Sequence, residues 1–271
     1  MPMKVNKKIV DTTLRDGEQC PGITFSPKEK IHLALLLDAL GVYEIEAACI
    51  DIHNMDLKFI NTIMEQKKQA KVSLWCRMRQ EDVYGACILG PDLIHIGVPV
   101  SYVQIYTKLK KNKVWVQREI QSCIEIANHY NIPVTVGLED SARADIGFIL
   151  TLIRQLYLLG VHTVRVADTV GTLTPDRGEE IVKLIHGAIQ ELEIEIHEHN
   201  DLGMAVANSI VMANAGGNLI DCTLLGIGER VGNCSLYDFI HASERIFDCG
   251  IDKKKIREVE EELIKILRKA W

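Results

Sequence analysis

The chain has 271 residues, of which 47% are apolar and 25% charged, so it is long enough to bury a sizeable hydrophobic core. Its formal charge of −6 comes from 31 basic and 37 acidic residues. Because no long block of one charge is present, neither nucleic acid nor a membrane surface is an expected partner.

The N-terminus and the cysteines predict a cytoplasmic protein. Residues 1–10 include lysines but no apolar run of signal-peptide length. No later segment reaches the roughly 18 to 20 apolar residues of a membrane span. The eight cysteines are scattered and none forms a CxxC pair, so reduced and mostly buried thiols are expected.

Short apolar or β-branched runs alternate with amphipathic stretches, and the pattern repeats about every 30 residues. Strands are predicted at residues 8–14, 43–48, 71–76, 93–98, 133–138, 163–167, 193–199 and 219–225. Eight such units of this total length are what an α/β fold of the (β/α)8 TIM-barrel type requires.

Helix boundaries support this assignment. Ser26-Pro27-Lys28-Glu29 predicts a helix start with a capping box, and Thr174-Pro175 repeats the start signal. Gly41 and Gly160 are placed where a helix C-terminus is expected.

The end of the chain predicts one further helix. Residues 252–271 are charged, with an apolar face made by Ile256, Val259, Leu263, Ile266 and Leu267. This helix is expected either to cap the barrel or to bind another chain. We therefore divide the sequence into a catalytic barrel at 1–250 and a C-terminal helix at 251–271.

Polar residues gather where the predicted strands end, which is where TIM barrels carry their reactive groups. The first strand runs into residues 12–19, the fifth into Glu139, the sixth into Thr169, and the seventh into residues 197–201. The eighth runs into a loop with three glycines at 226–233, which matches neither common nucleotide-binding pattern.

His197 and His199 are the strongest sign of a metal site. Two residues apart on a strand, both imidazoles point to the same side, inward at the barrel mouth. Histidines bonded to core carbonyls are the alternative, although a same-face pair then needs two separate explanations. Asp16 and Asn233 are placed to complete a site, with a cap of the next turn as the alternative for Asp16 and a turn residue as the alternative for Asn233. Nitrogen and oxygen ligands fit Mg²⁺, Mn²⁺ or Zn²⁺.

Two charged residues are candidates for catalysis. Arg15 is suited to stabilising an oxyanion at a metal-bound carbonyl, with an ordinary salt bridge as the alternative. Glu139 is a candidate for proton transfer, with a pair to Arg143 as the alternative.

Three motifs together resemble the isopropylmalate and homocitrate synthases, a family of metal-dependent TIM barrels. They are residues 11–19 (DTTLRDGEQ), 197–203 (HEHNDLG) and 228–233 (GERVGN). The resemblance covers nearly the whole chain in order. Residues 75–77 (WCR), 98–101 (VPVS) and 136–144 (VGLEDSARA) look most like homocitrate synthases of the nitrogen-fixation type.

The resemblance implies an acyltransferase that condenses acetyl-CoA with a 2-oxo acid, here 2-oxoglutarate, to give homocitrate and CoA. The implied metal ligands are Asp16, His197, His199 and Asn233. The implied catalytic residues are Arg15 and Glu139, and the implied substrate-binding residues are Gln19 and Thr169. Arg77 is the candidate for a distal substrate carboxylate, with an ordinary salt bridge as its alternative role.

The sequence departs from the family at two places. A cysteine, Cys234, follows the asparagine of the third motif, where the family has another small residue. Full-length synthases also continue past the barrel into a region that supplies a catalytic histidine and tyrosine, whereas this sequence stops at Trp271. We therefore expect the barrel-bearing subunit of a split synthase, completed by a second subunit, and a homodimer is a further family expectation.

Several alternatives stay open at this point. Citrate, isopropylmalate or citramalate synthases would use the same pattern with another 2-oxo acid. A metal-dependent acyl-CoA lyase or an aldolase needs little beyond the barrel. A barrel without chemistry that serves as a binding partner is disfavoured, because Arg15, Asp16, His197 and His199 are all present.

Overall fold

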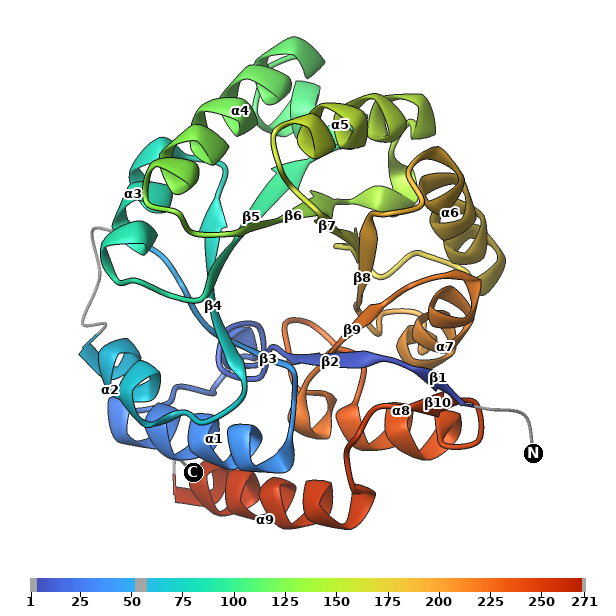
Figure 1. Ribbon diagram of the computed structural model, residues 1–271. Coiled ribbons are helices and arrows are strands. Elements are labelled where there is room, and N and C mark those ends of the chain that lie inside the picture. The colour runs from blue at the N-terminus through green and yellow to red at the C-terminus, as the bar shows by residue number, and fades with distance from the viewer. Residues whose placement is uncertain (1–3, 52–57, 270–271) are drawn as a thin grey trace.

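The computed structural model describes residues 4–51 and 58–269, and its centre is a closed barrel of parallel strands (Figure 1). Each strand pairs with the next along the chain, and β9 pairs with β2 to close the ring. The strands are β2 (Lys8–Asp11), β3 (Glu44–Cys49), β4 (Lys71–Arg77), β5 (Leu93–Pro99), β6 (Val134–Glu139), β7 (Thr163–Asp168), β8 (Glu193–Glu198) and β9 (Leu219–Cys222). The predicted TIM barrel is confirmed.

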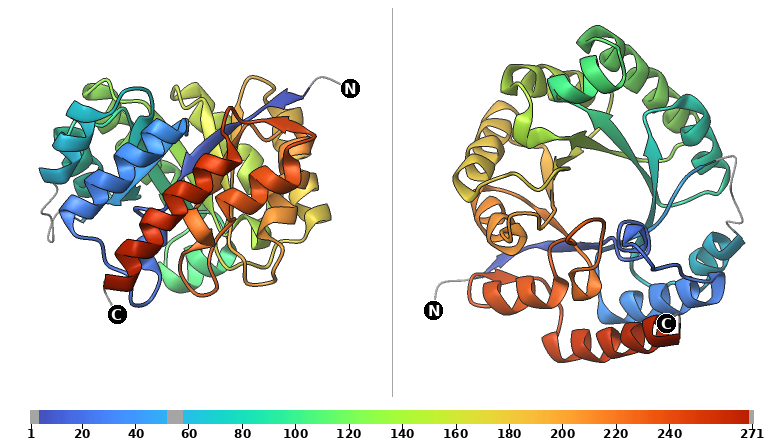
Figure 2. Two further views of the ribbon diagram at one scale, coloured as in Figure 1. Left: turned by 90° about the horizontal axis from the view of Figure 1, so that it is seen from below. Right: turned by 180° about the vertical axis from the view of Figure 1, so that it is seen from behind.

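Helices surround the barrel and cover the outer face of its strands (Figures 1 and 2). They are α1 (Pro27–Leu40), α2 (Lys58–Gln66), α3 (Gln80–Ile88), α4 (Lys113–His129), α5 (Ile146–Leu158), α6 (Pro175–Ala188), α7 (Ala205–Ala215), α8 (Leu236–Ser243) and α9 (Lys253–Lys269). The mouth loops add the short helices η1 (Gly17–Gln19), η2 (Val103–Lys108), η3 (Ser141–Arg143) and η4 (Leu224–Gly226).

All eight predicted strands are present, but three of them end earlier than predicted. The first leaves the sheet after Asp11, because the Thr12 carbonyl accepts the N–H groups of Arg15, Asp16 and Gly17 and so folds the chain into a tight turn. The predicted eighth strand, 219–225, stops at Cys222, and the predicted seventh, 193–199, stops one residue short of its prediction.

The barrel strands alternate between apolar outward residues and polar inward ones. In β8, Ile194 and Ile196 are fully buried in the hydrophobic core. Between and beside them, Glu195 and His197 belong to a buried polar cluster inside the barrel. The period of two residues in a strand produces this division. It puts an apolar layer between strands and helices and leaves a polar barrel interior.

The helix boundary predictions are largely confirmed. The Ser26 hydroxyl accepts from the Glu29 backbone N–H, and the Glu29 carboxylate accepts from the Ser26 backbone N–H, which completes a capping box at α1. Gly41 ends α1 with a φ of +95°. Thr174 precedes α6, but its side chain makes no capping hydrogen bond there.

The predicted C-terminal helix is present as α9, and its apolar face is used within the chain. Ile256, Val259, Leu263 and Ile266 are buried. The helix lies against α1 and α8 on the outside of the barrel (Figures 1 and 2). Of the two roles expected for this helix, packing on the barrel is the one observed.

A small two-stranded parallel sheet was not predicted. β1 (Val5–Asn6) pairs with β10 (Phe247–Asp248) and so joins the two ends of the barrel sequence. Strands of two residues are too short to show a periodic pattern. Within the described residues no helix is long and apolar enough to cross a membrane. The eight cysteines are free thiols, five of them buried.

Candidate active site

Three predicted metal ligands meet at the barrel mouth. Asp16 Oδ2 lies 3.1 Å from His197 Nε2 and 3.5 Å from His199 Nε2. One ligand atom from each of the three residues lies within 4.8 Å of the others, and all three side chains are buried. The turn after β2 and the end of β8 thus bring together residues that are about 180 positions apart in sequence.

Hydrogen bonds orient both imidazoles. His197 Nδ1 lies 2.9 Å from Asp221 Oδ2, on β9. His199 Nδ1 lies 3.1 Å from the Asp168 backbone carbonyl, at the end of β7. With Nδ1 donating in each ring, both Nε2 atoms present a lone pair toward Asp16. Partners of this kind fix metal-binding histidines in proteins.

Asn233 joins the three ligands through the backbone. It forms an antiparallel bridge with His199, although the two residues belong to different loops. Its side-chain nitrogen donates to the Ile227 carbonyl at 3.3 Å. A Cβ on Gly228 would lie 2.5 Å from that nitrogen, so glycine is needed where the loop folds over Asn233.

The unsatisfied polar atoms of this cluster fit a divalent cation. Within the described residues, Asp16 Oδ2, His199 Nε2 and Asn233 Oδ1 are buried and make no hydrogen bond. Buried acceptors normally have a partner, and here a cation would satisfy all three. Burial alone would raise the pKa of Asp16, but the neighbouring Arg15 guanidinium holds it well below its usual value. The carboxylate is therefore charged and ready to bind a metal.

Glu229 is a further carboxylate at this centre. Its Oε1 lies 3.7 Å from His199 Nε2. Arg230 next to it donates to Asp201 at 2.8 and 3.0 Å and to the Thr169 carbonyl at 3.0 Å. The second and third motifs are thus bound together by a salt bridge that the sequence analysis did not assign.

Arg15 lies directly beside the ligand cluster. Its Nη1 is 3.6 Å from Asp16 Oδ2, and its Nε donates to Glu46 on β3. The guanidinium also lies 5.6 Å from the centre of the Trp75 ring. Arg15 is nearly buried, so its charge is little screened by water.

Glu139 and Thr169 form a second polar group at the mouth. Thr169 donates its hydroxyl to Glu139 Oε2 at 2.8 Å and accepts the Asp140 backbone N–H at 2.8 Å. The alternative of a pair between Glu139 and Arg143 is not what is observed, because Arg143 pairs with Asp140 at 2.7 Å. Glu139 is therefore held by an uncharged neighbour.

The remaining two predicted residues are not part of these groups. Arg77 ends β4 and pairs with Asp82 at 2.6 Å and with Asp51 at 3.5 Å. Gln19 is exposed in η1. Neither contacts the cluster of Asp16, His197 and His199 in the described part of the chain.

Four buried charged residues beneath the cluster were missed by the sequence analysis. Arg165 on β7 contacts Glu46, Glu195 and Asp221, at distances of 2.7 to 2.9 Å. Burial raises the pKa of Asp221 to about 7, although Arg165 acts in the opposite direction. The alternation of charged with β-branched residues in 163–168 and 193–198 is the signal that could have placed Arg165 and Glu195 inside the barrel.

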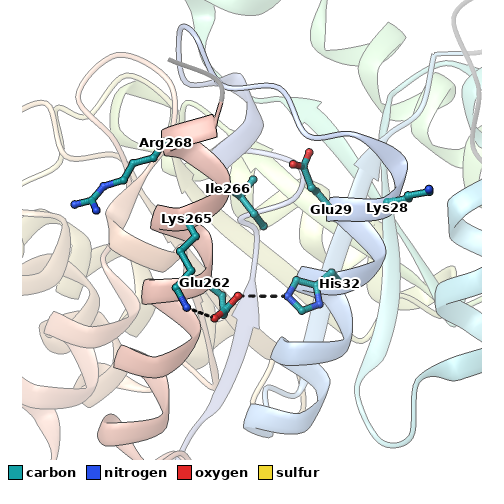
Figure 3. A pocket seen from close by; sticks show the side chains of 7 residues that line it. All are labelled: Lys28, Glu29, His32, Glu262, Lys265, Ile266 and Arg268. Carbon is teal, nitrogen blue, oxygen red and sulfur yellow. Dashed lines mark hydrogen bonds and ion pairs between the residues drawn. The ribbon is translucent and has the colours of Figure 1, made fainter.

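A separate groove of about 550 Å³ lies between α1 and α9, outside the barrel wall (Figure 3). Glu262 is paired there with Lys265 at 2.6 Å and with His32 at 3.8 Å.

Comparison with known proteins finds a matching family model and several sequence relatives. The model of the HMGL-like family matches residues 6–263. The alpha subunit of homocitrate synthase from Clostridium pasteurianum is 40% identical over 97% of this chain and 98% of its own length. Homocitrate synthase from Frankia alni is 36% identical over 90% of this chain and 70% of its own length.

A further relative carries the name of a different synthase. The 2-isopropylmalate synthase 2 of Caldanaerobacter subterraneus subsp. tengcongensis is 35% identical over 93% of this chain and 66% of its own length. Among solved structures, the HMG-CoA lyase of Bacillus subtilis has a TM-score of 0.87 at 17% identity, covering 98% of this chain and 95% of that one. At this identity the likeness shows the fold alone. The resemblance inferred from three motifs is confirmed by the sequence relatives.

Proposed function

Because the chain belongs to the HMGL-like family, we propose that it condenses acetyl-CoA with a 2-oxo acid and releases CoA. The observation that carries this proposal is the cluster of Asp16, His197 and His199, with Arg15 at 3.6 Å from the shared carboxylate. The relatives named as homocitrate and isopropylmalate synthases support the same class of reaction.

Asp16, His197, His199 and Asn233 would hold the metal, which supplies Lewis-acid polarisation of the substrate keto group when bound. Arg15 then faces the oxygen that gains negative charge as the new bond forms. Its guanidinium stabilises that charge without giving up a proton. Because Arg15 is buried and held by Glu46, it needs little reorganisation for this role.

Glu139 is the proposed base. It accepts a proton from the methyl group of acetyl-CoA, whose carbon then bonds to the keto carbon of the acceptor. Thr169 holds one carboxylate oxygen of Glu139 and leaves the other free for the proton. The alkoxide formed from the keto oxygen takes up one proton, equivalent to the one that Glu139 removed, and becomes the hydroxyl group. Water then hydrolyses the thioester to a carboxylic acid and free CoA.

We propose 2-oxoglutarate as the acceptor and homocitrate as the product. The relative that is 40% identical over almost the whole of both chains carries the homocitrate synthase name, which supports this choice. Arg77 is the proposed contact for the distal carboxylate, in exchange for one of its present acidic partners. Gln19 is proposed to line the acceptor site near Arg15.

We also propose that a second subunit completes the enzyme. The supporting observation is the Clostridium pasteurianum relative that is named as an alpha subunit. The match to this chain covers 98% of that subunit's length. The homocitrate synthase of Frankia alni is longer than this chain, because the match covers only 70% of that enzyme's length. The second subunit is proposed to supply what that additional length supplies in single-chain enzymes, and the barrels are proposed to form a homodimer.

The test is CoA release from acetyl-CoA by the metal-loaded chain with a panel of 2-oxo acids. Each acceptor is assayed with and without the candidate second subunit encoded beside this chain. Release with 2-oxoglutarate that His197→Ala abolishes and His129→Ala, an exposed histidine on α4, retains supports the proposal. No release with any acceptor, alone or with the second subunit, rejects condensation and directs attention to acyl-CoA cleavage.

A further inference from the structure

Arg165 is a buried cation inside the barrel that the proposed reaction does not use. It is 1% exposed and lies below the ligand cluster, on β7. Its Nη2 is 2.8 Å from Glu46 Oε2 and 2.7 Å from Glu195 Oε1, and its Nε is 2.9 Å from Asp221 Oδ2. These four residues are called the Arg165 network below.

Two of the three carboxylates also hold residues of the active site. Glu46 uses its other oxygen, Oε1, to accept the Nε–H of Arg15. Asp221 uses the same oxygen, Oδ2, for Arg165 and for His197 Nδ1 at 2.9 Å. A continuous series of charged contacts therefore runs from Arg15 through Glu46, Arg165 and Asp221 to His197.

The geometry of a guanidinium makes this connection possible. Its planar fork donates to several carboxylates in fixed directions, which a lysine ammonium on a flexible stem does not reproduce. A buried ion network by itself adds little stability compared with apolar packing. Its value here is that one rigid group holds both Glu46 and Asp221 at fixed positions.

We propose that Arg165 is a positioning residue that orients Arg15 and His197 together, through Glu46 and Asp221. Second partners of metal ligands typically change metal affinity about 10- to 100-fold when altered. The inference rests on the proposed function only for the role of Arg15. Its effect on His197 concerns metal binding and is measured without substrate.

The first experiment compares Arg165→Lys with the wild type. Co²⁺ affinity is measured by competition with a chromophoric chelator, and the visible Co²⁺ spectrum reports ligand geometry. Arg165→Lys is expected to weaken Co²⁺ binding about 10-fold and to shift the spectrum. In the condensation assay kcat is expected to fall, with the KM for acetyl-CoA unchanged, because Arg15 acts in the transition state.

Glu195→Gln is the matched control. Glu195 is buried in the same network, but it contacts neither Arg15 nor His197. The carbonyl oxygen of the new amide can still accept a hydrogen bond from Arg165. A purely structural network predicts that Glu195→Gln and Arg165→Lys lower the unfolding midpoint alike and leave Co²⁺ affinity unchanged. The proposal requires that only Arg165→Lys weakens Co²⁺ binding.

A double-mutant cycle tests the positioning role of Arg165 even if the Arg165→Lys variant does not fold. Glu46→Gln touches no metal ligand directly, so it affects Co²⁺ binding either through Arg165 and Asp221 or through Arg15 and Asp16. In the first case its effect disappears in an Asp221→Asn background, and in the second it persists unchanged. Additive effects of Glu46→Gln and Asp221→Asn on Co²⁺ affinity overturn the proposal.

The failure of the two proposals can be told apart. Wild-type Co²⁺ affinity and spectrum in folded Arg165→Lys reject the positioning role, whatever the reaction is. Absence of CoA release with every 2-oxo acid rejects the condensation, while the Co²⁺ titrations still decide the role of Arg165.

Discussion

Single atoms decide whether the ligand cluster can form. Asn233 reaches the cluster only because Gly228 leaves room for its amide, and the loop containing both residues folds back on itself at Gly226 and Gly232. Glycine is required at position 232 for two reasons. Its φ is +96°, and a Cβ there would lie 2.1 Å from the Gly226 carbonyl oxygen.

Gly228→Ala is expected to weaken metal binding about 10-fold and to leave the fold intact. The new methyl group would lie 2.5 Å from Asn233 Nδ2 and push this side chain away from His199. Calorimetric titration with Mn²⁺ or Zn²⁺ measures the effect, which is of the size expected for a displaced ligand environment. Gly187→Ala on α6 is the control, since nothing lies within 4 Å of its added Cβ. Equal metal affinity in both variants would show that Asn233 is not a ligand.

His95 predicts how stability depends on pH. It is fully buried on β5, and burial together with the nearby Arg165 and Arg15 holds its pKa well below the usual value. The folded chain thus keeps His95 neutral, while the unfolded chain takes up a proton below about pH 6.5. Above that pH, His95 therefore does not lower the free energy of unfolding. As the pH falls below about 6.5, protonation of His95 in the unfolded chain lowers the free energy of unfolding progressively.

His95→Asn removes this dependence. Between pH 6.5 and 5, the free energy of unfolding of the wild type is expected to fall by up to about 1.4 kcal/mol per pH unit more steeply than that of the variant. Urea unfolding at several pH values measures both slopes. Parallel slopes would mean that His95 accepts a proton in the folded chain.

At the scale of elements, the strands and helices follow the sequence closely and their ends do not. All eight predicted barrel strands are present, yet the predicted first strand, 8–14, ends at Asp11. Apolar and β-branched residues continue through 12–14, so the sequence pattern does not show where this strand ends. The strand ends because three backbone N–H groups converge on the Thr12 carbonyl and turn the chain at the mouth of the barrel.

α9 is expected to be part of the folding unit of the barrel. Leu263 is fully buried in the core cluster, on the helix face that lies against α1 and α8. Leu263→Ala is expected to lower the free energy of unfolding by about 2 to 5 kcal/mol in a single transition, as measured by thermal and urea unfolding. The exposed neighbour variant Glu261→Ala should change it by less than about 0.5 kcal/mol. A separate early transition for α9 would contradict this.

At the scale of the whole molecule, the ligand cluster connects distant parts of the barrel. Asp16 follows β2, His197 lies near the end of β8, His199 directly follows that strand, and Asn233 follows β9. A cation held by these residues binds the folded chain and not the unfolded one. Metal binding at the proposed site would therefore be coupled to the stability of the entire barrel.

Adding Mn²⁺ or Zn²⁺ is expected to raise the melting temperature of the wild type. A metal concentration of 100 times Kd adds about 2.7 kcal/mol to the free energy of unfolding. In His199→Ala this increase should be lost, while the metal-free melting temperature stays close to that of the metal-free wild type. Calorimetric scans with chelator and with excess metal measure both quantities. An equal increase in the two proteins would place metal binding elsewhere.

The sequence by itself determined the barrel and its helices, and it predicted the side chains of Asp16, His197 and His199 that the structure brings together. Period-two and helical patterns depend on local chemistry, and His197 and His199 share one short segment in which their relative direction follows from strand geometry. The motif around Asp16 and the motif around Asn233 were likewise each recognisable from a few consecutive residues.

Only the tertiary structure decided how these segments act on one another. The contacts of Arg165 with Glu46, Glu195 and Asp221 join four different strands. The packing of α9 on the barrel and the pairing of Arg143 with Asp140 in place of Glu139 are likewise tertiary outcomes. Local patterns show which face of a strand is polar, whereas closure of the barrel determines which polar residues from other strands meet there. That closure is a property of all eight strands together.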